Sequence, residues 1–130
     1  MISYIIDANL ILRYLLNDIP AQADITEAYF RQAKKGTISL TIPTVVVNEV
    51  LYVLVKVYKL TRTQLTDKLI AILDMDYLDI EERSIVKETL KFYTKPSISF
   101  VDAYLLAKSQ ITDKELLTFD RRIKRLKIPS

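Results

Sequence analysis

Short apolar segments alternate with longer helical patterns along this chain, and this alternation restricts the fold more than any other feature. The run from Ser3 to Ile6 is typical of a short buried strand. The residues after it repeat at helical spacing, namely Leu10, Ile11, Tyr14 and Leu15. Because parallel strands are joined by crossover helices, the alternation predicts an α/β fold, a three-layer α/β/α domain with a mostly parallel sheet of four to five strands.

Local start and stop signals place the other elements. Pro20 opens a helix that we expect to run to Lys34-Lys35, with Gly36 after its end in the left-handed conformation that glycine adopts cheaply. The other predicted helices run from Pro43 to about Tyr58, from Thr61 or Thr63 to near Asp74, from Glu81 to about Tyr93, and from Phe100, capped by Ser99 after a break at Pro96, to about Gln110. The other predicted strands are Thr37 to Thr41, Tyr77 to Ile80 and Glu115 to Phe119, the last followed by a short basic helix.

The size and hydropathy of the chain indicate one soluble domain covering residues 1–130. A chain of 130 residues buries roughly two thirds of its unfolded surface around a single core. No apolar run approaches the roughly 18 to 20 residues that span a bilayer, and the longest is interrupted by Asn48 and Glu49. The first residues lack the pattern of a secretory signal. We therefore expect no membrane association and a cytoplasmic location, which the absence of cysteine also fits.

Missing residue types exclude several kinds of chemistry. The chain has no histidine and no cysteine, which excludes a His/Cys zinc site, a Ser-His-Asp or Cys-His nucleophile and a histidine general base. Its single glycine, Gly36, excludes the glycine-rich loops that cradle phosphates of nucleotide cofactors. An enzyme of this composition must work with carboxylates, hydroxyls, lysines or hard metal ions.

Positive charge is concentrated at the carboxyl end. The net charge is +3, and the last eleven residues, DRRIKRLKIPS, carry five of the basic side chains. Such a tail suits a polyanionic partner. A solvated basic helix explains the same pattern equally well.

Four acidic residues stand at positions where an ordinary surface charge is not expected. Asp7 and Asp120 follow the first and last predicted strands, whose carboxyl ends would share the ligand-binding edge of a parallel sheet. Glu49 lies within an otherwise apolar helix, and Asp102 lies in the first turn of the helix capped by Ser99. Each also has a structural explanation. Aspartate is a favoured helix cap, the Ser99–Asp102 spacing is that of a capping box, and Glu49 could belong to a solvent-facing stripe with Tyr52, Lys56 and Lys59.

Together the segments around these acids resemble a known family. YIIDANLILRYLL, PTVVVNEVLYVL, ISFVDAYLLAKS and LLTFDRRIKRL, in this order, are similar to the PIN-domain ribonucleases, in particular VapC-like toxins of toxin-antitoxin systems. The resemblance covers essentially the whole chain and maps the acidic quartet of the family onto Asp7, Glu49, Asp102 and Asp120. Asn9 matches the small polar residue near the first acid, and Thr118 matches the hydroxyl residue two places before the last.

The resemblance implies a metal-dependent endoribonuclease. Converging carboxylates repel each other unless a cation neutralises them, and oxygen ligands favour Mg²⁺ or Mn²⁺. Asp7, Asp102 and Asp120 would then be metal ligands, and Glu49 would orient the attacking water. Arg121 and Arg122 are candidate phosphate contacts, standing with Lys124 where some relatives carry a further acid, so a second metal would bind more weakly. The expected partners are RNA, a cognate antitoxin and a second copy of the chain. No motif indicates which RNA is cut.

Two other functions remain open. A phosphoryl-transfer domain of receiver or phosphatase type also places an aspartate after its first strand. The phosphatases need a second acid where Asn9 stands, however, and the receivers need adjacent acids near the first strand. A PIN-like module retained for protein contact without catalysis is the other alternative, against which the four intact acids argue. Arg13 is interpreted as a structural partner rather than a catalyst, and Asp113, which precedes the last predicted strand, is not expected to join the site.

Overall fold

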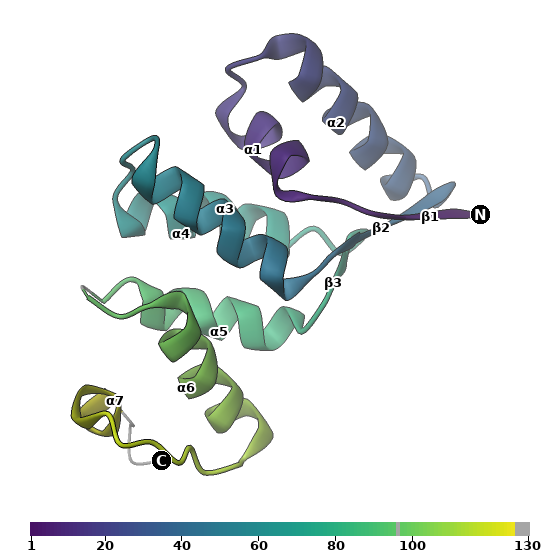
Figure 1. Cartoon of the computed structure of the whole chain (residues 1–130). Helices are drawn as coiled ribbons and strands as arrows, with labels where there is room; N and C mark the ends of the chain where they lie inside the picture. Colours follow the sequence, from purple (N-terminus) through teal and green to yellow (C-terminus); the bar gives the residue numbers. More distant parts are fainter. Residues whose placement is uncertain (96, 127–130) are drawn as a thin grey trace. The chain divides into compact units, whose positions relative to one another are not determined.

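The amino-terminal part of the chain contains a three-stranded parallel sheet (Figure 1). The computed structural model describes residues 1–95 and 97–126. The strands β1 (Ile2–Ile5), β2 (Ile38–Ile42) and β3 (Asp79–Ile80) lie in the order β1-β2-β3, with Ile5 opposite Thr41 and Thr41 opposite Asp79. Helices connect the strands, so the predicted α/β class and parallel sheet are confirmed, consistent with a three-layer α/β/α arrangement.

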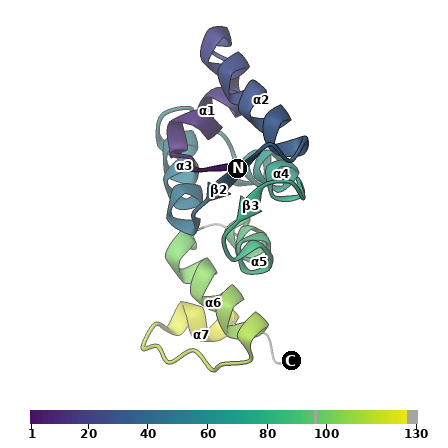
Figure 2. The same cartoon turned by 90° about the vertical axis from the view of Figure 1, so that its right-hand side faces the viewer.

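The described residues form two compact units. The first unit spans Met1–Glu82 and the second begins at Arg83. Besides the sheet, the first unit contains α1 (Ala8–Leu16), α2 (Pro20–Lys34), α3 (Thr44–Lys56) and α4 (Arg62–Leu73). In this unit α1 packs against α2 and α3, α2 packs on β2, and α3 contacts α4 (Figures 1 and 2).

Predicted start and stop signals place the helices of the first unit within a few residues. Pro20 is the first residue of α2, and Gly36 adopts φ of 79° just after that helix. Thr61 caps α4 in a capping box with Gln64. The backbone N–H of Gln64 donates to the Thr61 hydroxyl at 3.2 Å, and the backbone N–H of Thr61 donates to the Gln64 side-chain oxygen at 3.0 Å. Pro43 is the cap of α3 rather than a residue of its first turn.

The core of the first unit lies on β2 and on the inner faces of α3 and α4. Leu40 and Ile42 of β2 are buried, as are Val50 and Leu54 of α3 and Leu65 of α4. Complete burial of such a side chain contributes about 1.5–3 kcal/mol. The core therefore fixes which face of α3 points outward.

The first strand is more exposed than the sequence suggested. We expected a buried strand, but Ile2 and Ile5 are 61% and 77% exposed. The reason is that β1 is at the edge of the sheet formed by the described residues, pairs only with β2 there, and has no helix packed extensively on its faces. An apolar run identifies a strand but does not say how many neighbours it has.

The second unit is helical. It contains α5 (Arg83–Tyr93), α6 (Phe100–Thr112) and α7 (Arg121–Leu126), and α5 packs closely against α6. Leu90 of α5 and Ala103 and Ala107 of α6 are completely buried. The small alanine side chains allow the two helices to approach closely. The predicted cap Ser99 is confirmed, whereas the predicted break at Pro96 lies outside the described residues.

The prediction of a strand from Glu115 to Phe119 is wrong. Residues 114–120 are neither helix nor strand, and the side chains of Leu117 and Phe119 are almost fully exposed. A strand requires a partner for its backbone groups, and this segment pairs with none of the described strands. The described part of the sheet therefore has three of the four to five strands expected.

No helix among residues 1–95 and 97–126 has both the length and the apolar character needed to cross a bilayer.

Candidate functional site

Asp7 joins the end of the first strand to α1 and caps that helix. Its Oδ1 accepts hydrogen bonds from the backbone N–H of Asn9 at 3.0 Å and of Leu10 at 3.3 Å. The carboxylate is exposed, and within the described residues its Oδ2 has no hydrogen-bond partner. The capping explanation is thus confirmed, and one oxygen is left for another ligand.

Asp120 caps α7 with the same geometry in the second unit. Its Oδ1 accepts from the N–H of Arg122 at 2.8 Å and of Ile123 at 3.3 Å. The N–H of Asp120 donates to the hydroxyl of Thr118 at 3.0 Å. Thr118 therefore holds the backbone of the residue whose side chain was predicted to bind a metal ion.

Asp102 and Glu49 also lie on helices, but their carboxylates accept no capping hydrogen bond from a backbone N–H among the described residues. Asp102 is in the first turn of α6, where its N–H donates to the Ser99 hydroxyl at 3.1 Å. The described bonds do not include the reciprocal one from Ser99 N–H to the Asp102 carboxylate that would complete a capping box. Glu49 is exposed on α3, and its carboxylate has no ion-pair or hydrogen-bond partner within the described residues.

The remaining predicted residues lie beside these acids. Asn9 is exposed in the first turn of α1, two residues after Asp7. Arg121 and Arg122 begin α7, both exposed, and one guanidinium nitrogen of Arg122 donates to the Ser97 carbonyl oxygen at 3.2 Å. Arg121 is therefore the less constrained of the two for contact with a phosphate.

The acids are divided between the two units. Asp7 and Glu49 belong to the first unit, and Asp102 and Asp120 to the second. Among the described residues, no three carboxylates are gathered closely enough to hold a metal ion. The convergence of all four acids stays a prediction. The donor set itself is suited to a hard divalent cation, because it offers carboxylate oxygens without sulfur or nitrogen ligands.

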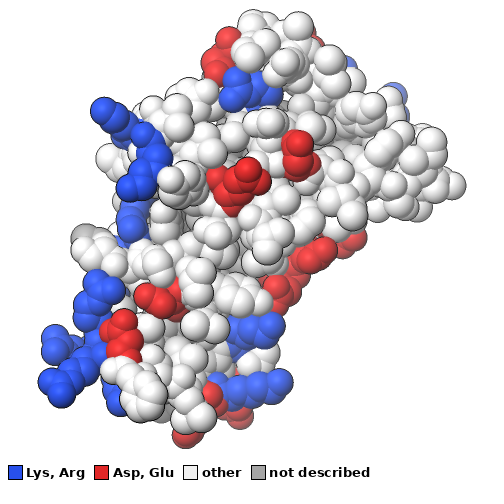
Figure 3. Space-filling view, in the orientation of Figure 1, with Lys and Arg blue, Asp and Glu red and all other residues white. Residues whose placement is uncertain are grey.

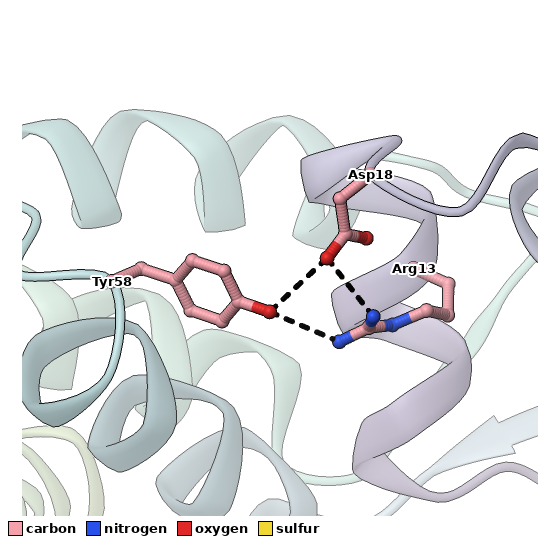
Figure 4. A network of polar contacts seen from close by, with 3 residues as sticks. All are labelled: Arg13, Asp18 and Tyr58. Atoms are coloured by element: carbon pink, nitrogen blue, oxygen red, sulfur yellow. Dashed lines mark hydrogen bonds and ion pairs between the residues drawn. The ribbon is translucent and has the colours of Figure 1, made fainter.

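A polar network holds the turn between α3 and α4 to the end of α1 (Figure 4). Arg13 forms an ion pair with Oδ2 of Asp18 at 3.0 Å and donates to the Tyr58 hydroxyl at 3.4 Å. The Tyr58 hydroxyl donates to the same Asp18 oxygen at 3.1 Å. The structural role predicted for Arg13 is confirmed. The hydrogen bond to Tyr58 was missed because this residue is 45 residues away and no local pattern links it to Arg13.

Basic side chains gather near the same turn. Lys56 ends α3, Lys59 lies in the turn and Arg62 begins α4, and Figure 3 shows the basic side chains gathered over this region. Glu49, Tyr52, Lys56 and Lys59 are all exposed, as the predicted solvent-facing stripe requires. A second basic group surrounds α7.

Comparison with known proteins gives one family over both units. The family model of the PIN domain matches residues 4–129. The chain is also similar to a VapC ribonuclease of Aquifex aeolicus (strain VF5), with 25% identity over 123 residues that cover 94% of this chain and 90% of the relative. No solved structure matches. The family match includes all four candidate acids.

Proposed function

The chain belongs to the PIN-domain family, and from this premise we propose that it is a metal-dependent endoribonuclease, the toxin of a toxin-antitoxin pair. The observation that carries the proposal is the family match, which extends over residues 4–129 and so over Asp7, Glu49, Asp102 and Asp120. Similarity to a VapC ribonuclease over nearly the whole chain supports RNA as the substrate. In this proposal residues 1–130 work as one domain, and Asp7, Glu49, Asp102 and Asp120 are its catalytic acids.

Three of the acids would hold a Mg²⁺ or Mn²⁺ ion. Asp7, Asp102 and Asp120 would supply carboxylate oxygens, and the Oδ1 bonds of Asp7 and Asp120 to their helices would fix the direction of each free Oδ2. The bound ion would supply Lewis-acid chemistry, neutralising the phosphate and lowering the pKa of a water molecule. Charge neutralisation by the ion would also allow the carboxylates to lie together.

The other residues would position the substrate and the ligands. Glu49, whose carboxylate is exposed and has no described partner, would orient the attacking water. Thr118 would hold the backbone of Asp120 through the hydrogen bond already described, and Asn9 would support Asp7. Arg121 and Arg122 would contact phosphates next to the cleaved bond through their planar guanidinium groups.

The proposed partners are an antitoxin and a second copy of the chain, in the cytoplasm. Exposed apolar side chains support a covering partner in each unit, because such groups are costly to leave in water. They are Ile2, Ile5, Val45 and Val57 in the first unit and Val101, Leu105, Leu117 and Phe119 in the second. If the purified chain is monomeric at micromolar concentration, the homodimer is excluded. If no small protein encoded beside it suppresses its toxicity, the toxin assignment fails.

Cleavage of total RNA tests the proposed activity. Purified chain should cut RNA internally with millimolar Mn²⁺ or Mg²⁺ and should lose this activity when EDTA is added. Mapping the new ends across the transcriptome would identify the substrate. Equal cutting of double-stranded DNA would contradict an RNA-specific enzyme, and the absence of any cleavage with either ion would favour a PIN-like module without catalysis.

A further inference from the structure

The outward face of α3 carries an ordered series of side chains in line with Glu49. Glu49, Tyr52 and Lys56 are spaced by three and four residues, the spacing that places side chains on one face of a helix. The opposite face is fixed by the buried residues Val50 and Leu54. The exposed face is therefore held in one orientation by the core of the first unit.

Tyr52 is a large aromatic side chain left in solvent at the middle of this face. It is 63% exposed, and no ring or cation contact of Tyr52 occurs among the described residues. The described tyrosines with ring contacts include Tyr4 with Tyr29, and Tyr14 with Phe30. Tyr52 thus offers a free aromatic surface on a rigid helix.

Two lysines without ion-pair partners continue the series toward the α3–α4 turn. Lys56 and Lys59 are exposed, and neither forms an ion pair within the described residues. The hydrogen bonds of Tyr58 to Asp18 and Arg13 hold the backbone between them. Lys59 itself adopts φ of 54°, so the turn has a defined shape rather than a continued helix. The positive charges are therefore held at the end of the α3 face.

We propose that this face positions the RNA substrate, with Tyr52 stacked on an unpaired base and Lys56 and Lys59 in contact with the phosphates of the same strand. The inference rests on the proposed function and adds binding residues to it. Aromatic side chains stack on bases that are free of pairing, and lysines neutralise the phosphates of the strand. From Glu49 to Lys56 the helix rises about 10 Å, roughly three times the ~3.4 Å rise of stacked nucleotides. The charge of the lysines favours a polyanion over an apolar protein surface as the occupant.

Substitution of Tyr52 separates stacking from other roles. Tyr52→Ala should raise KM for single-stranded RNA by about 5- to 150-fold with a much smaller change in kcat, because a stacked base contributes about 1–3 kcal/mol. Tyr52→Phe keeps the ring and should behave like wild type. Ile25→Ala is the control, since Ile25 is an exposed apolar residue on α2 and does not belong to the α3 face that carries Val45 and Tyr52.

A binding measurement tests the inference without cleavage. The fluorescence of 2-aminopurine in a single-stranded RNA should be quenched when the RNA binds to the Asp7→Asn variant, in which cleavage is expected to be lost. This quenching should disappear in the Asp7→Asn/Tyr52→Ala double variant. The slope of log K against log salt should become less steep by about 0.7 for Lys56→Gln or Lys59→Gln, because each variant removes one phosphate contact. Lys68→Gln, which changes an exposed lysine on α4, should leave the slope unchanged.

The outcomes distinguish this inference from the proposed function. If wild type cuts RNA and Tyr52→Ala has wild-type KM and wild-type quenching, the inference is wrong while the ribonuclease stands. If wild type cuts no RNA with either ion, the ribonuclease fails, and the quenching alone decides whether α3 binds RNA. If Tyr52→Ala and Val45→Ala both change the oligomeric state without changing the quenching, the face is a protein interface and the inference is overturned.

Discussion

Asp7 and Asp120 hold the starts of two different helices with the same hydrogen-bond geometry. In each, Oδ1 accepts from the backbone N–H groups two and three residues later. The two explanations considered from the sequence, a helix cap and a metal ligand, therefore do not exclude each other. One carboxylate oxygen caps the helix while the other stays available, and the cap fixes where that second oxygen points.

The Arg13–Asp18–Tyr58 network should contribute measurably to stability. Tyr58→Phe removes the hydroxyl that joins Asp18 to Arg13, and the free energy of unfolding should fall by about 0.5–1.5 kcal/mol. We expect the lower end of this range because Asp18 keeps its ion pair with Arg13 and its side chain is 35% exposed. Urea unfolding would measure the change. Tyr52→Phe is the control, since it removes an exposed tyrosine hydroxyl, and an equal loss in both variants would contradict the role of the network.

A buried hydroxyl in α4 should be replaceable with a gain in stability. The Oγ1 atom of Thr66 is buried without a hydrogen-bond partner. Burying such a group costs roughly 1–3 kcal/mol, so Thr66→Val, which keeps the shape, should raise the free energy of unfolding by about 1 kcal/mol. Thr89→Val is the matched control, because the Thr89 hydroxyl is buried but donates to the Ile85 carbonyl at 2.7 Å. The stability of both variants can be measured by thermal unfolding. An equal gain in Thr66→Val and Thr89→Val would contradict the idea that the missing hydrogen-bond partner of Thr66 lowers stability.

Tyr77, which lies two residues before β3, should make the protein sensitive to alkaline pH. Burial raises the pKa of Tyr77, and the nearby Tyr14 and Asp76 raise this pKa further. In the unfolded chain the tyrosine loses its proton at about pH 10, before the folded protein does, so stability falls as pH rises from there to the higher pKa of the folded state. Tyr77→Phe removes this contribution. The Tm of wild type should therefore fall more than the Tm of Tyr77→Phe as the pH rises from about 8 to about 11. An equal fall of the two Tm values would contradict the prediction.

Features that depend on nearby residues could be predicted from the sequence. Pro20, Gly36, Thr61 and Ser99 act on the backbone within a few residues of themselves, and each marks a helix end in the structure. The same holds for the acids, whose positions at helix starts or on the outer face of α3 follow from local spacing.

Features that depend on distant partners could not be predicted. The exposure of Ile5 depends on how many strands pair with β1, and the segment ending at Phe119 needed a partner strand that no local pattern specifies. Asp18 and Tyr58 are 40 residues apart, so their hydrogen bond has no local signal either. For the same reason, the acids could be identified in the sequence while their convergence across two units stays a prediction.

Asp7→Asn removes one charge from the proposed metal site and keeps the helix cap. Asparagine is as good a helix cap as aspartate, so its side-chain oxygen should accept the hydrogen bonds from Asn9 and Leu10, and the free energy of unfolding without metal should change little. RNA cleavage should fall by orders of magnitude, because neutralisation of charge and activation of water both depend on the bound ion.

Metal binding to Asp7→Asn separates the ligand role from the cap. Millimolar Mn²⁺ should raise the Tm of wild type, because an ion that binds only the folded state stabilises it by mass action, and this rise should shrink or vanish in Asp7→Asn. Asp24→Asn, which changes an exposed acid on α2, should keep the full metal-induced rise and the full activity. If Asp7→Asn instead cuts RNA normally and shows the wild-type rise in Tm, then Asp7 is a helix cap alone, and the metal would have to be held by Asp102 and Asp120 without it.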